Sequence, residues 1–205
     1  MAYPPGGTFF DLPGKRSYVD VPVDESKDNA IQTTEFLDAS EALLGLFDHL
    51  GSVAFTPVKN DINGNITKIR TRQLASPLDS STLQSLVSTE LATKKHTATE
   101  ALLWLTRGLD FTAQALRHNM DNPSEELSTS FRSAYGNTLK QHHSFVIKPI
   151  FSAAMSATPY RKDFYAKLGD DQERVGKELE MWLKALERRV GILKEFMGRK
   201  ENAWK

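Results

Sequence analysis

The stretch TATEALLWLTRGLDFTAQALRHN, residues 97–119, carries the clearest secondary-structure pattern in the chain. Four of its leucines recur at intervals that return to one face of an α-helix: Leu102, Leu105, Leu109 and Leu116. An α-helix makes one turn in about 3.6 residues, so these intervals collect apolar side chains on a single stripe. The stretch therefore predicts a long helix whose leucine face lies in the core.

Helical spacing also covers most of the remaining chain. It predicts further helices over residues 33–50, 56–74, 77–91, 124–136, 143–158, 163–167 and 170–198. No run of alternating β-branched residues is present, so no strand is predicted. We therefore expect an all-α protein of about eight helices, arranged in two layers or as a bundle.

The first thirty residues have a different composition from the rest. They are rich in Pro, Gly and Asp, with Phe9, Phe10 and Tyr18 as apolar anchors. We predict that residues 1–30 form an irregular arm packed on the domain. A chain of 205 residues fits one domain better than two. Residues 31–205 are therefore expected to form that single domain.

The composition narrows the function classes. The chain has 26 Lys and Arg against 26 Asp and Glu, whereas nucleic-acid-binding proteins normally carry a basic excess. We therefore expect no nucleic-acid partner. The sequence has no cysteine, which excludes disulfides, thiolate metal sites and cysteine nucleophiles. It also has no signal-peptide pattern and no apolar run of about 18 residues, so a cytoplasmic location is expected.

Polar residues follow a helical repeat in DINGNITK, residues 61–68. Intervals of four and three residues place Asp61, Asn65 and Lys68 on one helical face. The isoleucines of this segment lie on the adjoining face, so the polar trio borders the core. Two interpretations remain open at this point: a solvated face with an Asp–Lys pair, or a site for a polar ligand.

A second stripe on the helix predicted over residues 97–119 consists of Trp104, Arg107, Gly108 and Phe111. The face of an indole packs well against rings rich in C–H groups. A tryptophan beside an arginine and a glycine therefore suits a planar or sugar ligand. The alternative is that Trp104 only fills a wide core.

The pair His142 and His143 stands at the start of the helix predicted over residues 143–158. His143 would head a stripe that continues through Ile147, Ile150 and Phe151. A histidine at the polar end of an apolar stripe is either a hydrogen-bonded core residue or a functional group. The spacing alone leaves both interpretations open.

Several segments, in the same order, resemble the glycolipid transfer protein family. They are LFDHLGSVAFTPVKND (46–61), GNITKIR (64–70), LWLTRGL (103–109), and His143 to Phe145 followed by Pro159 and Tyr160. FSAAMSATPYRKDFY (151–165) is most similar to the fungal heterokaryon-incompatibility members of that family. The resemblance implies a two-layer α-helical sandwich of about eight helices that encloses an apolar lipid cavity. It also implies non-enzymatic binding of glycosphingolipids and their transfer between membranes.

The resemblance assigns roles to individual residues. It implies a site for the first sugar and the ceramide amide made of Asp61, Asn65, Lys68, Trp104, His143 and Arg107. In this site His143 matches the residue that bonds the ceramide carbonyl, and Arg107 supports the site from the next helical turn. The ceramide chains are expected in a tunnel lined by Phe47, Phe55, Pro57, Val58, Phe111, Ile147 and Phe151. The expected membrane contacts are Tyr135, Lys140, Phe145 and Tyr160.

The resemblance also implies partners. These are a glycosphingolipid, namely galactosyl-, glucosyl- or lactosylceramide, and transiently a membrane surface. A Phe-Phe-Asp-like segment of the family, which here reads Leu46-Phe47-Asp48, suggests an endoplasmic-reticulum anchor protein as a further partner. An unrelated Phe9-Phe10-Asp11-Leu12 lies in the arm. We expect no catalytic residue, no metal and no cofactor.

Other functions are weighed against transfer. A glycolipid sensor or interaction protein would need the same lipid site, so the sequence does not separate it from a carrier. A ceramide-1-phosphate carrier is less expected, because the branch of the family that carries this lipid has basic residues in place of Asn65 and Trp104. An enzyme is not expected, since the chain has no G-x-S-x-G, H-E-x-x-H or phosphate-binding Gly-rich motif. One departure is Ser144-Phe145, where many animal members have a tryptophan after a His-Gly pair.

Overall fold

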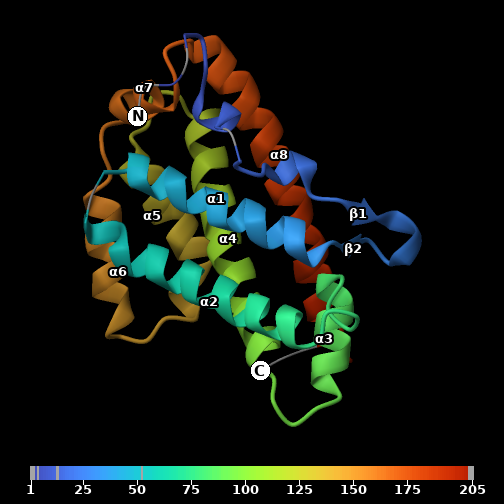
Figure 1. Ribbon diagram of the computed structural model, residues 1–205. Coiled ribbons are helices and arrows are strands. Elements are labelled where there is room, and N and C mark those ends of the chain that lie inside the picture. Colours follow the sequence, from blue (N-terminus) through green and yellow to red (C-terminus); the bar gives the residue numbers. More distant parts are fainter. Residues whose placement is uncertain (1–2, 4, 13, 52, 203–205) are drawn as a thin grey trace.

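The structure is a computed structural model that describes residues 3, 5–12, 14–51 and 53–202. Its α-helices in this part of the chain are α1 (Thr33–His49), α2 (Thr56–Ala75), α3 (Leu83–Leu91), α4 (Thr97–Asp121), α5 (Leu127–Asn137), α6 (Ile147–Ser156), α7 (Arg161–Leu168) and α8 (Gln172–Gly198). Helices α1 and α2 lie side by side, α2 packs on α4, and α4 also contacts α5 and α8 (Figure 1). The predicted all-α, two-layer fold is confirmed.

Helix α4 occupies the centre of the molecule. All four leucines of its predicted core stripe are completely buried: Leu102, Leu105, Leu109 and Leu116. Gly108 lies where α2 crosses α4, and a Cβ atom there would stand 3.8 Å from Cγ1 of Ile62. Gly108 thus lies at the contact between the two helices that carry the predicted head-group site, with room for a methyl group.

The beginning of α4 is held by a side chain from α3. The carboxylate of the buried Glu90 accepts hydrogen bonds from the backbone N–H groups of Ala98 at 3.0 Å and Thr99 at 2.6 Å. It also accepts one from the Thr99 hydroxyl at 2.7 Å. The first N–H groups of a helix have no partner within the helix, so an acceptor from elsewhere stabilises its start. Glu90 therefore fixes where α4 begins.

The amino-terminal segment contains short regular elements. They are the 3-10 turns η1 (Phe9–Asp11), η2 (Tyr18–Asp20) and η3 (Glu25–Lys27), and the antiparallel strands β1 (Val23–Asp24) and β2 (Ala30–Ile31). The expectation of no strand was therefore wrong. Two-residue strands are too short to show an alternating pattern, and the turn between them depends on positive φ angles at Asp28 and Asn29.

The amino-terminal segment is anchored on α1 and α8. The completely buried Tyr18 shares a 2.9 Å hydrogen bond with the hydroxyl of Ser40 on α1. Arg189 of α8, also buried, donates to the backbone carbonyl of Val21 at 2.5 Å. Burial lowers the pKa of Arg189. The division into an arm (1–30) and one domain (31–205) stays a prediction, and those ranges include residues outside the described part: 1, 2, 4, 13, 52 and 203–205.

Most predicted helix bounds agree with the structure within a few residues, but one differs where it matters. The helix predicted from His143 begins only at Ile147, as α6. Before it lie the 3-10 turn η5 (Leu139–Gln141) and a turn that includes His143. His143 is therefore not the first residue of a helical stripe. The backbone N–H groups of His142 and His143 both bond to the carbonyl of Leu139, which turns the chain back toward α4 and α5.

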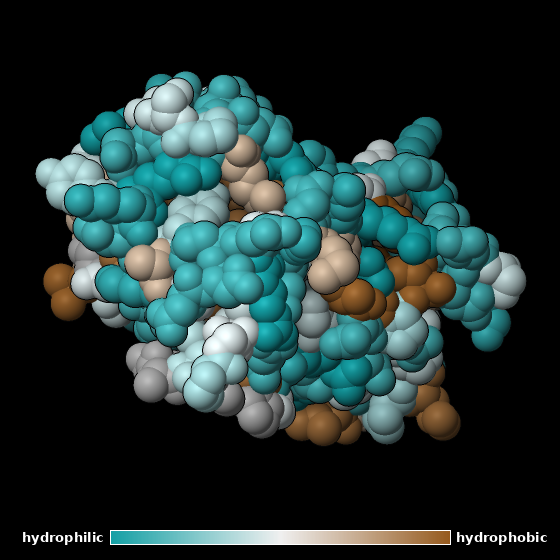
Figure 2. All heavy atoms as spheres, turned by 90° about the horizontal axis from the view of Figure 1, so that it is seen from above, coloured by the Kyte–Doolittle hydropathy of each residue, from teal (hydrophilic) through white to brown (hydrophobic). Residues whose placement is uncertain are grey.

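The outer surface is predominantly polar. Figure 2 shows hydrophilic side chains over most of the face seen from above, with hydrophobic ones in small separate groups. Among the described residues, no helix is both long enough and apolar enough to cross a bilayer.

Candidate functional site

The polar trio of α2 forms one edge of the candidate site. Asn65 is buried, whereas Asp61 and Lys68 are exposed. The amide of Asn65 donates to the carboxylate of Asp61 at 3.4 Å, as the interval of four residues predicts. The Asn65 side chain thus orients Asp61 at the rim between α2 and α4.

The charge state of Asp61 is set mainly by its surroundings. The residue as a whole stays exposed, but protein atoms displace part of the water around its carboxyl group, and this raises its pKa. The nearby Lys68 and the hydrogen bond from Asn65 act in the opposite direction. A partly desolvated carboxylate binds a hydrogen-bond donor more strongly than one in water does. Asp61 is therefore suited to accept from an N–H or a hydroxyl group.

Trp104 forms the second edge of the site, on α4. Its ring is half-buried, and the guanidinium carbon of Arg107 stands 4.8 Å from the ring centre. Burial lowers the pKa of Arg107. The cation–π contact fixes one face of the indole and supports the role of Arg107 as a neighbour that steadies Trp104.

His143 lies between two aromatic rings. It stacks on Trp104 at 6.1 Å with an interplanar angle of 19°, and its ring centre is 4.4 Å from that of Phe151. Burial lowers the pKa of His143, and the neighbouring charges of His142 and Lys148 lower it further. His143 is therefore neutral at pH 7.

The hydroxyl of Tyr135 lies 3.3 Å from Nδ1 of His143. A neutral histidine that accepts a hydrogen bond at Nδ1 carries its proton on Nε2. With Tyr135 as the donor, His143 presents an Nε2–H group, as needed to bond a carbonyl oxygen. Sequence reasoning missed this role of Tyr135.

A continuous series of ring contacts leads from this site into the core. Beyond His143 and Phe151 it passes through Phe111, Phe131 and Phe55 to Phe47, with ring centres 5.6 to 6.2 Å apart. The four inner rings are all at most 2% exposed. Four of the predicted tunnel residues therefore lie in one row, although their rings fill the space between them.

Phe131 belongs to this row but was absent from the prediction. It follows Leu127 by four residues and precedes Ala134 by three, and all three are buried on α5. This spacing identifies a core face. The spacing does not show that Phe131 contacts Phe111 of α4, because that contact depends on how the two helices pack.

The other predicted tunnel residues occupy different environments. Val58 is buried and Ile147 is half-buried, in agreement with an interior position. Pro57 is exposed in the first turn of α2, a position that suits proline because the N–H group is not needed there. Pro57 therefore stands apart from the buried tunnel residues, and its place in the tunnel stays a prediction.

Three of the four predicted membrane contacts are on the surface. Phe145 is 85% exposed, Tyr160 is 67% exposed, and Lys140 is also exposed. Tyr135 is the exception, because its side chain is buried and its ring stacks on Phe151 at 5.4 Å. The ring of Tyr135 therefore belongs to the aromatic row, and its contact with a membrane stays a prediction.

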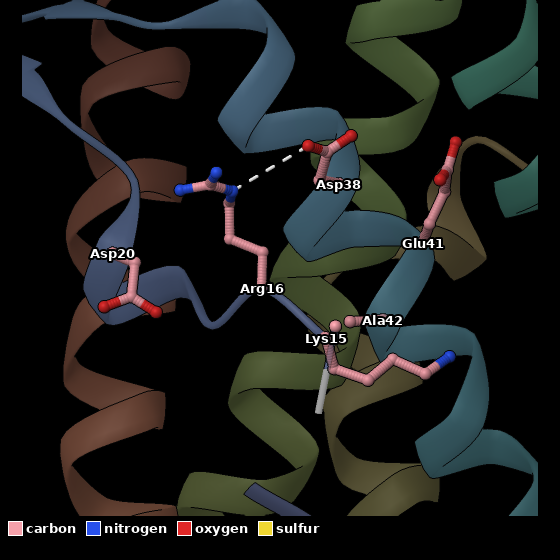
Figure 3. Close-up of a pocket in the computed structure, with 7 residues that line it drawn as sticks. Lys15, Arg16, Asp20, Asp38, Glu41 and Ala42 are labelled. Atoms are coloured by element: carbon pink, nitrogen blue, oxygen red, sulfur yellow. Dashed lines mark ion pairs between the residues drawn. The ribbon is translucent and has the colours of Figure 1, made fainter. Parts of the chain in front are cut away.

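A charged pocket elsewhere in the molecule is separate from this site. It measures about 510 Å³ and is lined by Gly14, Lys15, Arg16, Asp20, Asp38, Glu41 and Ala42 (Figure 3). Arg16 points toward Asp38 across the pocket, 3.8 Å away, and Arg70 of α2 bonds Asp38 at 2.8 Å. These pairs join the amino-terminal segment to α1 and α2. No group of three or more His, Asp or Glu residues in the described ranges is arranged to hold a metal ion.

Comparison with known proteins places this geometry in a family context. The family pattern described as "Glycolipid transfer protein (GLTP)" matches residues 31–170. A glycolipid transfer protein of Aureobasidium melanogenum is 69% identical over 203 residues, which cover 99% of both chains. The crystal structure of HET-C2, a fungal glycolipid transfer protein, aligns with a TM-score of 0.93 at 58% identity, covering 96% of this chain and all of the other. A structure of FAPP2, which selects simple glycosphingolipids with the GLTP fold, aligns with a TM-score of 0.82 at 34% identity, over 93% and 95% of the chains.

Proposed function

Because the chain belongs to the glycolipid transfer protein family, we propose that it binds a glycosphingolipid and carries it between membranes without covalent change. The lipids are galactosyl-, glucosyl- and lactosylceramide, and the protein works in the cytoplasm with transient visits to membranes. One observation carries the proposal. It is the row of ring contacts that begins at Trp104, beside the predicted head-group site, and ends at Phe47 in the core.

The head-group end of the row matches the chemistry of a glycosylceramide. The carboxylate of Asp61 accepts from the amide N–H and a sugar hydroxyl, while Nε2–H of His143 donates to the amide carbonyl. Leaving one of these partly buried groups unpaired costs about 1–3 kcal/mol. Trp104 offers its indole face to the first sugar, and Lys68 donates to sugar hydroxyls.

The apolar end of the row suits the ceramide chains. Moving alkyl chains into water costs about 0.8 kcal/mol per CH₂, so a carrier must enclose them. Rings such as Phe111 and Phe55 offer an environment close to that of the bilayer. Because these rings contact one another, lipid uptake requires them to turn aside.

The polar groups favour a neutral head group over a phosphate. Asp61 would repel a phosphate, while Asn65 and Trp104 contribute no positive charge. A phosphate site normally gathers two or three Arg or Lys residues. The charge of Lys68 already acts on the carboxylate of Asp61, and Arg107 lies against the ring of Trp104.

A vesicle-to-vesicle assay with the full chain tests the proposal. We expect galactosylceramide to move and ceramide-1-phosphate to stay behind. Asp61→Val should reduce galactosylceramide transfer about tenfold or more, because it strands the amide N–H and a sugar hydroxyl. The exposed Asp121→Val, at the far end of α4, is the matched control and should transfer at the parent rate. Parent-rate transfer by Asp61→Val, or faster movement of ceramide-1-phosphate, would contradict the assignment.

An enzyme would be recognised by what it does to galactosylceramide itself. Chromatography of galactosylceramide after incubation with the protein is expected to return the lipid unchanged. A hydrolysed or modified product would show an enzyme instead of a carrier.

A sensor or anchored protein remains the second candidate, and the structure gives it little support. In the segment that reads Leu46-Phe47-Asp48, the leucine and the phenylalanine are buried and Asp48 pairs with Lys59. Phe9 of the arm is buried as well. An anchor protein would therefore have to recognise other residues, and a pull-down that retains an anchor protein from the endoplasmic reticulum would favour this candidate.

A further inference from the structure

A pocket between α4 and α8 adjoins the proposed head-group site. It measures about 370 Å³, and the two helices pack against each other beside it (Figure 1). Its charged and titratable lining residues are Arg107 and Asp110 of α4, Lys194 of α8, and His142 of the turn after η5. Arg107 also lies against the indole of Trp104, so the pocket and the head-group site share this residue.

His142 meets the indole of Trp104 edge to face. The ring centres are 6.3 Å apart, and the ring planes make an angle of 82°. Aromatic rings favour this arrangement because the positive edge of one ring meets the negative face of the other. Arg107 and His143 are the other two neighbours of the indole already described. His142 is therefore a third side chain that fixes the orientation of Trp104.

The backbone holds His142 in this place. Its N–H group donates to the carbonyl of Leu139 at 2.9 Å, and the N–H group of His143 donates to the same carbonyl at 3.2 Å. Both histidines therefore reach Trp104 from one turn. His142 is an exposed residue, so its ring does not fill the core and can exchange a proton with water.

The ring contact with Trp104 is made by a neutral His142 at pH 7. Protein atoms displace part of the water around its ring, which lowers the pKa of His142, and the charge of Arg107 lowers it further. The ordinary pKa of histidine is about 6.5. His142 is therefore uncharged at neutral pH and gains a proton only in more acidic solution.

The pocket offers no free carboxylate to balance a protonated His142. Asp110 is the one acidic residue among the described residues that line it. Its carboxylate already binds Lys194 at 2.6 Å and accepts from the amide of Gln114 at 3.0 Å. A protonated His142 would face Arg107 without a counter-charge, and like charges repel. Because both side chains contact Trp104, this repulsion moves at least one of them away from the indole.

We propose that His142 is a positioning residue of the head-group site, which holds Trp104 in place for the first sugar while it is neutral and releases it when protonated. His142 acts through Trp104 and does not need to touch the lipid. The inference rests on the proposed function and adds a property to it. Binding of a neutral glycosylceramide should weaken in acidic solution, and His142 should account for part of that loss.

Extraction of galactosylceramide from phosphatidylcholine vesicles by the full chain tests this role at about pH 7.5 and about pH 5.5, on either side of the ordinary histidine pKa. His142→Ala should extract about two- to tenfold less than the parent at the higher pH, because one aromatic contact is lost. His142→Phe keeps a ring but has no proton to gain. It should restore extraction at the higher pH and lose less than the parent at the lower pH.

The matched control is His118→Phe, which removes a titratable histidine near the other end of α4. Its extraction should fall with pH as that of the parent does. An acid-induced loss in His142→Phe that equals the loss in the parent would overturn the positioning role. Unchanged extraction by His142→Ala at the higher pH would overturn it as well.

The orientation of Trp104 can be followed without lipid. Its indole N–H resonance, identified by its absence in Trp104→Phe, should shift between the two pH values in the parent and shift less in His142→Phe. Equal shifts in both proteins would overturn the positioning role. A parent protein that extracts no galactosylceramide at either pH would overturn the proposed function, while the resonance would still test the contact between His142 and Trp104.

Discussion

At the scale of single residues, the carboxyl group of Asp61 shows how a binding group can oppose stability. Burial raises its pKa, so the folded protein holds the proton of Asp61 more tightly than the unfolded chain does. Ionisation of Asp61 therefore reduces the free energy of unfolding as the pH rises through the raised pKa. Desolvation removes hydrogen bonds that water donates to the carboxylate. When lipid is bound, a sugar hydroxyl and an amide N–H would replace them.

The first prediction follows because ionised Asp61 lowers the free energy of unfolding. Asp61→Asn should raise the urea midpoint of unfolding at about pH 7, where the parent residue is charged. Below about pH 3 the parent residue is protonated in both states, and the two proteins should unfold alike. Galactosylceramide affinity should fall about tenfold at pH 7, because one charge-assisted acceptor is lost. A lower urea midpoint for Asp61→Asn at pH 7 would contradict the desolvation argument.

Tyr135 is the second residue for which the geometry makes a prediction. With the Tyr135 hydroxyl as the donor to Nδ1, the proton of His143 lies on Nε2, so Tyr135→Phe should lower galactosylceramide affinity about two- to tenfold while the helix content stays constant. The nitrogen NMR shifts of His143 should change toward a tautomer mixture. The matched control is Tyr165→Phe, because the buried Tyr165 hydroxyl has no hydrogen-bond partner within the described ranges. Unchanged histidine shifts in Tyr135→Phe would refute the positioning role.

At the scale of elements, α4 depends on an acceptor that it does not itself supply. Its own N-cap, His96, provides no side-chain cap, and Glu90 of α3 takes over this task. Because Trp104 lies only two turns from that end, the start of α4 also determines where the candidate site stands. The cap thus couples the α3–α4 corner to lipid binding.

The prediction at this scale concerns the cap. Glu90→Ala should lower the free energy of unfolding by about 1–3 kcal/mol, because two buried backbone N–H groups lose their acceptor. Glu90→Gln keeps one acceptor oxygen and should lose less. Urea unfolding followed by circular dichroism measures both, with the exposed Glu173→Ala of α8 as the control. Equal stability of Glu90→Ala and the parent would show that α4 does not need this cap.

At the scale of the whole molecule, sequence reasoning succeeded where a pattern is local. The leucines of α4 and the interval between Asp61 and Asn65 follow from helical geometry alone, and the family resemblance supplied the two-layer arrangement. What escaped prediction depends on contacts between distant segments. Phe131 joins the aromatic row only because α5 packs on α4, and His143 leaves its predicted helix because the turn after η5 redirects the chain. The positions of Pro57 and Tyr135 depend on tertiary packing in the same way.

The prediction at this scale concerns how the amino-terminal segment is held. Arg189→Met should leave the carbonyl of Val21 without its buried donor and make residues 3–31 cut about fivefold faster in limited proteolysis. Arg188→Met removes an exposed pair with Glu25 and should change the rate far less. Equal cleavage rates for Arg189→Met and the parent protein would show that Arg189 does not hold the segment.

The attachment of the amino-terminal segment to α8 also bears on how the protein is made. Arg174, Arg188 and Arg189 contact Asp11, Glu25 and Val21, so the anchors of the first residues lie near the end of the chain. A ribosome releases those first residues long before the arginines exist. The amino-terminal segment therefore takes its place on α8 only after that helix has emerged and folded.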